Sequence, residues 1–278
     1  MRKIFFLLLL ILSNCKLISQ TLETSLLRKY DDSATFSIPL PYVLDIYKGK
    51  KHLVYYGTQH SNNPDDSMYL DMEKRFITLK PQFAFNEGGN GWPVFSTKDS
   101  AVKLTGDPGF LIYLCHKHNV PVTTLEPTDS LEYDYLLKNF KKKDVLLMYF
   151  VRQLDQLQRQ KVSNSDFDND ANKFILALKK RGMPLNDKES KLSYFISCYE
   201  DFYKTKFNLM SFDPTSYWPI YNKNILNKIS RESAYFRDLH VIKVIEESLK
   251  KYDRVFVVMG GSHLVVEEPV LKYLFENY

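Results

Sequence analysis

Two histidines in the sequence follow glycine at the same spacing, and each comes just after a short apolar run. Gly57-Thr58-Gln59-His60 follows residues 53–56, and Gly260-Gly261-Ser262-His263 completes a run that begins at residue 255. Such runs are typical of buried strands, and glycine lets the chain leave a strand with unusual dihedral angles. If the two strands lie parallel in one sheet, both imidazoles are expected at its carboxyl edge, where open α/β sheets bind ligands.

Two carboxylates stand at the ends of further predicted strands. Glu87 ends the segment 82–87, and Glu126 follows the segment 120–125. Two imidazoles and one or two carboxylates in one pocket can bind a first-row divalent ion that lowers the pKa of a bound water towards neutral. The same groups can act without metal, with one histidine as general base and a carboxylate that orients it. The residues alone leave both chemistries open.

The elements that would position these residues alternate between strands and helices. Residues 42–47 and 52–56 predict a hairpin with Gly49 in its turn. Apolar residues then recur at helical spacing in five regions, which are 68–79, 110–118, 131–206, 230–252 and 267–275. The order predicts an α/β fold, with a mixed, largely parallel central sheet covered by helices and an antiparallel hairpin strand. Residues of about 131–215 are expected as a helical insertion over one face or rim of the sheet.

Local signals mark where helices should begin and end. Asp107-Pro108 is a good N-cap and first helical position for the helix Phe110 to His118. Within the insertion, the acidic, Asn-rich segment Asn164–Asp168 and the segment Gly182-Met183-Pro184 are expected as turns. A last helix, Glu267 to Phe275, is expected to close the domain.

Five short motifs in chain order resemble the TraB/TIKI/GumN family. The final one, Met259-Gly260-Gly261-Ser262-His263-Leu264, is similar to the family pattern Val-Gly-x-Gly-His-Leu. The resemblance extends over about Tyr42–Tyr278, with the helical insertion poorly matched, and Gln59 and the loop Gly88–Gly91 depart from the protease branch. The other four motifs are Gly57-Thr58-Gln59-His60, Asn86-Glu87, Thr124-Leu125-Glu126 and Arg237-Asp238.

This resemblance implies an EreA/ChaN/TIKI-like fold, because the family belongs to the group that contains the erythromycin esterases and the ChaN haem-binding lipoproteins. TIKI-like members are described as metal-dependent proteases, and the esterase branch as hydrolases with a histidine base. A secreted hydrolase of peptide or ester bonds is therefore expected. His60, Glu87 and His263 would bind Mn, Co, Zn or Fe, or supply the base. Arg237 would clamp an oxyanion or carboxylate, and Glu126 would orient a histidine.

Other readings remain open. Arg237 lies on an amphipathic helix, where an ion pair with Asp238 or Glu232 is the ordinary explanation, and Glu126 precedes a proline and could face solvent. Two further classes of function fit the same resemblance. One is a haem- or metal-binding transport protein of the ChaN kind, and the other is a non-catalytic, peptide-binding regulatory module. The sequence does not fix the oligomeric state.

The N-terminus is typical of an exported protein. Arg2 and Lys3 precede the apolar run Ile4–Leu12 and a polar stretch, which predicts a signal peptide at residues 1–19 and a single domain at 20–278. Export to the bacterial periplasm or the medium is expected, with a membrane anchor only if Cys15 is lipidated. Removing residues 1–19 lowers the formal net charge from +5 to +2, which argues against a nucleic-acid partner.

The two remaining cysteines, Cys115 and Cys198, fall in apolar helical patterns. Buried free thiols are the expected interpretation, although two cysteines of an exported protein could also form a disulfide.

Overall fold

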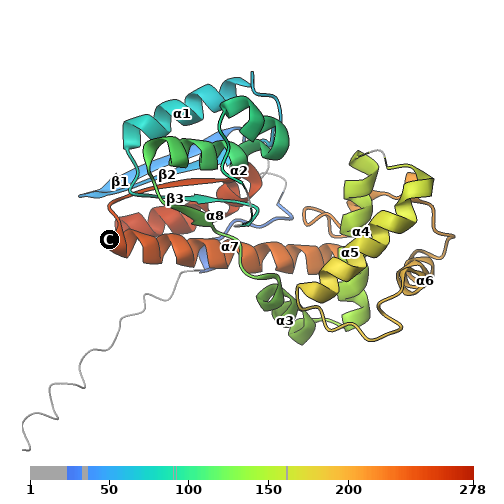
Figure 1. Cartoon of the computed structure of the whole chain (residues 1–278). Coiled ribbons are helices and arrows are strands. Elements are labelled where there is room, and N and C mark those ends of the chain that lie inside the picture. The colour runs from blue at the N-terminus through green and yellow to red at the C-terminus, as the bar shows by residue number, and fades with distance from the viewer. Residues whose placement is uncertain (1–23, 33–36, 90, 92, 161) are drawn as a thin grey trace, which may run out of the picture.

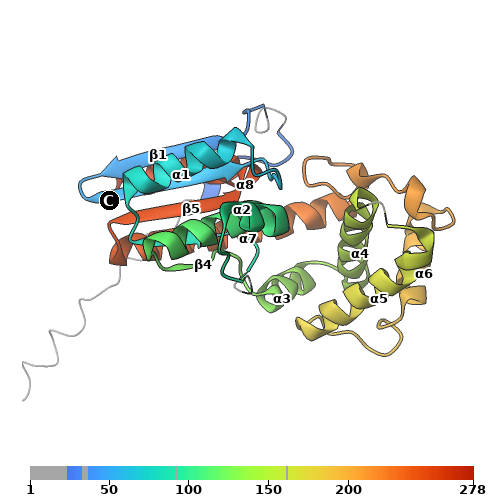
Figure 2. The ribbon, with the colours of Figure 1, turned by 45° about the horizontal axis from the view of Figure 1, so that its top comes forward.

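The computed structural model describes residues 24–32, 37–89, 91, 93–160 and 162–278. The expected signal segment 1–19, with Cys15, lies outside these residues. The chain folds into a sheet covered by helices and a lobe of further helices beside it (Figures 1 and 2). None of the described helices combines the length and the apolar character needed to cross a bilayer.

Five strands form one mixed sheet in the order β1-β2-β5-β3-β4. The antiparallel hairpin joins β1 to β2, and the remaining pairs are parallel. The last strand, β5, lies between β2 and β3, with Thr58 beside Gly260 and Asn86 beside Val258. The parallel strands β2, β5 and β3 therefore all end at the same edge of the sheet. The strands are β1 (Tyr42–Lys48), β2 (Lys51–Thr58), β3 (Phe83–Asn86), β4 (Val122–Thr124) and β5 (Arg254–Gly260).

Helices cover both faces of the sheet, which explains why its central strands are apolar throughout. Helices α1 (Ser67–Leu79) and α2 (Lys98–His118) pack on one face, and α7 (Ile225–Lys251) and α8 (Gly261–Glu276) on the other (Figure 1). The predicted α/β architecture and its order of elements are confirmed.

The remaining helices form what we call the helical lobe. It consists of α3 (Asp129–Asn139), α4 (Lys142–Arg159), α5 (Asn164–Lys180) and α6 (Leu192–Tyr203). Their apolar faces form a core of their own, to which the beginning of α7 adds Leu226 and Ile229. Helix α7 has 27 residues, about 40 Å at the usual rise per residue, and it runs from the lobe to the sheet (Figure 2).

The segment α2 consists of two helices that meet at a kink at Gly106, so the predicted helix start at Asp107-Pro108 is confirmed, although the Asp107 carboxylate contacts His60. Two other local predictions are corrected. Asn164–Asp168 is not a turn, because the Ser163 side chain caps α5, which begins at residue 164. Helix α8 begins at Gly261 rather than Glu267 and therefore carries His263 in its first turn.

The two cysteines behave as expected from their apolar surroundings. Cys115 and Cys198 are both buried free thiols. Burial raises the pKa of both thiols, so neither is activated as a nucleophile.

Candidate functional site

His60 follows the end of β2, and a buried carboxylate holds its ring. The Nδ1 atom lies 2.8 Å from Oδ2 of Asp107 on α2. Asp107 is 2% exposed, and it also accepts hydrogen bonds from the Thr58 hydroxyl at 2.5 Å, the Tyr69 hydroxyl at 3.1 Å and the Ser61 N–H at 3.3 Å. Four donors from β2, the following loop and α1 therefore converge on one carboxylate.

This arrangement shifts the pKa of both partners. The hydrogen bond to Asp107 raises the pKa of His60 above its ordinary value, against the opposite effect of burial. Burial alone would raise the pKa of Asp107, but the hydrogen bonds from His60 and Thr58 lower it overall. A negative Asp107 and an imidazole that readily takes a proton follow from this contact.

Glycine at the kink of α2 allows Asp107 to reach the histidine. Gly106 has φ 64°, in the left-handed region, and an added Cβ would lie 3.1 Å from the carbonyl oxygen of Ser61. A side chain at this position would strain the backbone and press on the loop that carries His60.

Glu87 follows β3 and lies beside His60. Its Oε2 accepts the Gly260 N–H at 2.7 Å and lies 3.9 Å from His60 Nε2, while its Oε1 accepts from Arg237 at 3.3 Å. Burial raises the pKa of Glu87, but the nearby charges of His263, Arg237 and His60 lower it overall. A Cβ on Gly260 would lie 2.9 Å from His60 Nε2 and 3.3 Å from Glu87 Oε2. Glycine thus leaves room for both side chains at the end of β5.

Arg237 on α7 joins two of the expected acids. Its Nε donates to Glu126 Oε2 at 2.9 Å, and its Nη2 donates to the other Glu126 oxygen and to Glu87. Glu126 therefore contacts Arg237 rather than a histidine. Arg237 does not form the alternative ion pairs with Asp238 or Glu232 of its own helix. Asp238 binds His263 instead, and Glu232 accepts from Tyr135.

The second histidine has a carboxylate partner of its own. His263 is 8% exposed, and its Nδ1 lies 2.5 Å from Oδ1 of the fully buried Asp238. The Tyr30 hydroxyl donates to Asp238 Oδ2 at 2.9 Å. Each Gly-x-x-His histidine is therefore held by a buried aspartate, one from α2 and the other from α7.

The expected metal ligands are only partly gathered. His60 and Glu87 are neighbours, but within the described residues the three-residue group with ligand atoms all within 4.8 Å is Asp238, His263 and Glu267. Neither carboxylate oxygen of Glu267 has a hydrogen-bond partner among these residues. Burial, and then the charge of Asp238, raises its pKa well above the ordinary value. Burial and the charge of Asp238 therefore both favour the neutral form of Glu267.

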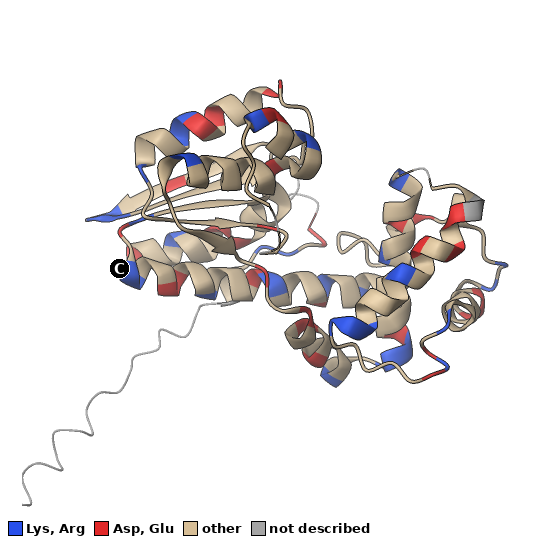
Figure 3. Cartoon of the chain, viewed as in Figure 1, with Lys and Arg blue, Asp and Glu red and all other residues tan. Residues whose placement is uncertain are grey.

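A cleft of about 1140 Å³ opens between the edge of the sheet and the helical lobe. Glu87, Glu126 and Arg237 line it on the sheet side, and α3, α4 and α5 form the other wall. Acidic and basic side chains both occur along the lobe and α7 (Figure 3). His60 and His263 do not line this cleft, but His60 lies next to Glu87, which does.

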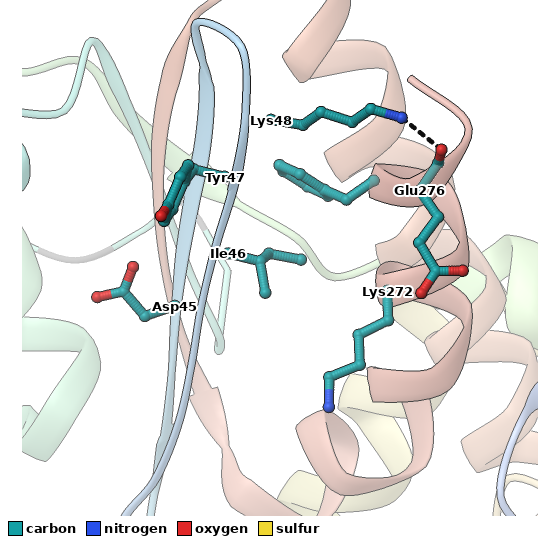
Figure 4. Close-up of a pocket in the computed structure, with 7 residues that line it drawn as sticks. Asp45, Ile46, Tyr47, Lys48, Lys272 and Glu276 are labelled. Atoms are coloured by element: carbon teal, nitrogen blue, oxygen red, sulfur yellow. Dashed lines mark hydrogen bonds between the residues drawn. The ribbon is translucent and has the colours of Figure 1, made fainter.

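A second hollow of about 510 Å³ lies at the opposite end of the hairpin. It is formed by the end of β1 and the end of α8, where Lys48 donates to the backbone carbonyl of Glu276 (Figure 4). None of the strand-end histidines or glutamates lines it, so we place the candidate site at the cleft.

The residues missed by the sequence analysis are those that hold the histidines. Asp107 was expected as a helix cap, Asp238 as a partner of Arg237, and Tyr30 was not considered. In the sequence these aspartates stand out only by their neighbours, because Asp107 follows Gly106 and Asp238 follows Arg237. These positions do not indicate which histidine each aspartate contacts.

The fold and the site define an α/β protein whose parallel strands end at two aspartate-held imidazoles and an arginine–glutamate cluster. Comparison with protein-family models, with curated proteins and with solved structures gives no match for this chain.

Proposed function

We propose that the chain is a hydrolase of ester or peptide bonds with His60 as its general base. The observation that carries the proposal is the contact of His60 Nδ1 with the buried Asp107, which leaves Nε2 free 3.9 Å from Glu87. The His60 side chain is 62% exposed, so water and substrate can reach it. Buried carboxylate, imidazole and accessible nitrogen form the arrangement that general-base catalysis requires.

The proposed chemistry uses few groups. With Nδ1–H donating to Asp107, the Nε2 of His60 takes a proton from the water that attacks the substrate carbonyl. The negative Asp107 stabilises the imidazolium that forms. Arg237, fixed by Glu126, positions Glu87 at the cleft, and the pair His263–Asp238 places a further imidazole near that carboxylate.

A metal-dependent version of this hydrolase is supported by one specific observation. Both histidines have Nδ1 engaged by a carboxylate, as metal-binding histidines commonly do. His60 Nε2 and Glu87 would hold Mn, Co, Zn or Fe, and His263 would have to approach to complete the set. Such an ion would supply a water of lowered pKa. In this version Asp107 and Asp238 keep the two rings in their binding orientation.

The test is a comparison of His60→Gln with His52→Gln. His52 also has an aspartate partner, Asp45, at 2.7 Å, but this pair lies on the exposed hairpin. Turnover is measured on nitrophenyl esters and on fluorogenic peptides, together with the metal content of the purified protein. We expect His60→Gln to lose about 100-fold or more in turnover, the usual contribution of a general base, and His52→Gln to keep full activity.

Other outcomes would point elsewhere. Equal turnover in both variants would contradict a role for His60. Peptide binding without turnover that survives His60→Gln would favour the regulatory module, and a Soret band on adding haemin would favour the transport class. Loss of turnover on chelation, with recovery on adding one of the four metals, would select the metal-dependent version.

A further inference from the structure

The lobe side of the cleft carries a cation that no described acid contacts directly, although its charge acts on the nearby Asp129. Four basic side chains line the cleft, and three of them are paired, Lys173 with Asp170 at 2.9 Å, Arg181 with Asp129 at 3.8 Å and Arg237 with Glu126. The fourth, Arg152 on α4, is half-buried and makes no hydrogen bond or ion pair with any residue that the structure describes.

The acids of this wall do not supply a direct partner for Arg152. Asp129 and Asp170 belong to the ion pairs with Arg181 and Lys173. Glu132 accepts from the Tyr149 hydroxyl at 2.6 Å and from the Ser233 hydroxyl at 2.5 Å. The Arg152 guanidinium lines the cleft without a direct acidic partner among the described residues, so its N–H groups can donate to a ligand there.

Three glutamines extend the same helical surface. Gln153, Gln156 and Gln160 also line the cleft, and their side-chain amides make no hydrogen bond with a described residue. Residues four apart lie on one side of a helix, so Arg152 and Gln156 on α4 and Gln160 at its C-cap follow one another along one side. An amide both donates and accepts, as a peptide group does, and a guanidinium binds a carboxylate with two parallel hydrogen bonds.

We propose that this surface of α4 recognises the substrate and that Arg152 binds a substrate carboxylate, such as the C-terminus of a peptide or one end of a small acid. The role of the bound molecule as substrate rests on the proposed hydrolase function, but the binding site itself does not. Arginine suits the task because its planar group matches the geometry of a carboxylate, whereas lysine offers only a point charge.

The experiment uses the tripeptide Ala-Ala-Ala as free acid and as C-terminal amide, and succinate as a small acid. Each is titrated into the ¹⁵N-labelled mature chain while the arginine Nε–H signals are followed by NMR. We expect the free acid to move the Arg152 signal to saturation and the amide to leave it in place. Competition by succinate would show that a small acid suffices, and its failure to compete would select peptides; either result supports a carboxylate site.

Variants distinguish a specific site at Arg152 from non-specific electrostatic attraction of the acid to the protein. Arg152→Gln should weaken binding of the free acid about 10-fold or more, the loss expected for a charge-assisted pair, and Arg152→Lys should restore only part of it. Lys143→Gln is the matched control, because Lys143 lies on α4 outside the cleft lining and pairs with Asp201. An unmoved Arg152 signal, equal binding of acid and amide, or unchanged binding by Arg152→Gln would overturn the proposal.

Failure of this inference and failure of the hydrolase proposal can be told apart. If His60→Gln abolishes turnover but Arg152→Gln changes neither binding nor KM, only the carboxylate site is wrong. If the free acid binds at Arg152 while His60→Gln has no effect on turnover, the site stands and the proposed hydrolysis at His60 does not.

Discussion

Replacement of Asp107 by Asn tests whether this residue holds His60, and it needs no knowledge of the substrate. Asp107 is almost fully buried and accepts from four donors, two on each carboxylate oxygen. Asn keeps the shape and one carbonyl oxygen, but it places an NH₂ group opposite two of these donors. The variant therefore removes the negative charge and two acceptor contacts with little change in volume.

The magnitude follows from these contacts. Each hydrogen bond to a charged group contributes about 1.5–3 kcal/mol. The Thr58 hydroxyl can turn to the Met259 carbonyl oxygen, 3.4 Å away, so part of the loss is recovered. We expect the free energy of unfolding to fall by about 2–4 kcal/mol.

The assay combines urea unfolding with NMR titration of the histidine rings. Because the pKa of His60 is raised above the ordinary 6.5, the stability that it contributes is complete below about pH 6.5 and is lost as the pH rises through its folded pKa. In Asp107→Asn the His60 pKa should fall, and this loss of stability with rising pH should shrink.

Asp45→Asn is the matched control, because Asp45 binds His52 at 2.7 Å on the exposed hairpin. Exposed pairs contribute about 0–1 kcal/mol, so this variant should stay within about 1 kcal/mol of the wild type. Equal destabilisation by the two substitutions, or an unchanged His60 pKa in Asp107→Asn, would refute the reasoning.

Three further predictions concern the other groups of the site. Arg237→Gln should lower the free energy of unfolding by about 1.5–3 kcal/mol in urea, because it leaves two partly buried carboxylates without their cation; a loss under 1 kcal/mol would contradict the pairing. Gly260→Ala should reduce turnover about 10-fold or more by displacing His60, whereas Gly91→Ala, with no atom within 4 Å of the added Cβ, should keep it. The pKa of Glu87 is lowered from 4.5, so its contribution to stability is present above about pH 4.5 and is lost as the pH falls through the folded value. Glu87→Gln should therefore flatten the acid side of the stability–pH profile, and an unchanged profile would argue against a charged Glu87.

The pattern of strands and glycines predicted much of the candidate site. Apolar runs ending in Gly-x-x-His indicated two parallel strands, and the structure indeed brings His60, Glu87 and Gly260 together at one edge. This succeeded because strand direction and order restrict where a residue just past a strand can lie.

The partners of the histidines could not be predicted in the same way. Asp107 has the local signature of a helix cap, but its carboxylate binds residues from β2, the next loop and α1 instead. That choice depends on the kink at Gly106 and on how α2 packs on the sheet, which helical periodicity does not report. Asn164–Asp168 was mistaken for a turn because its polar composition also suits the first turn of a helix after the Ser163 cap.

Helix α7 has a mechanical consequence for the site. It contributes Ile229 to the core of the lobe and Val241 to the core on the sheet. Between these positions, Arg237 and Asp238 reach the glutamates on one side and His263 on the other. If α7 tilted or moved along its axis, Arg237 and Asp238 would move together. A ligand that brings the lobe closer to the sheet would therefore change the surroundings of His60, through Glu87, and those of His263 at the same time.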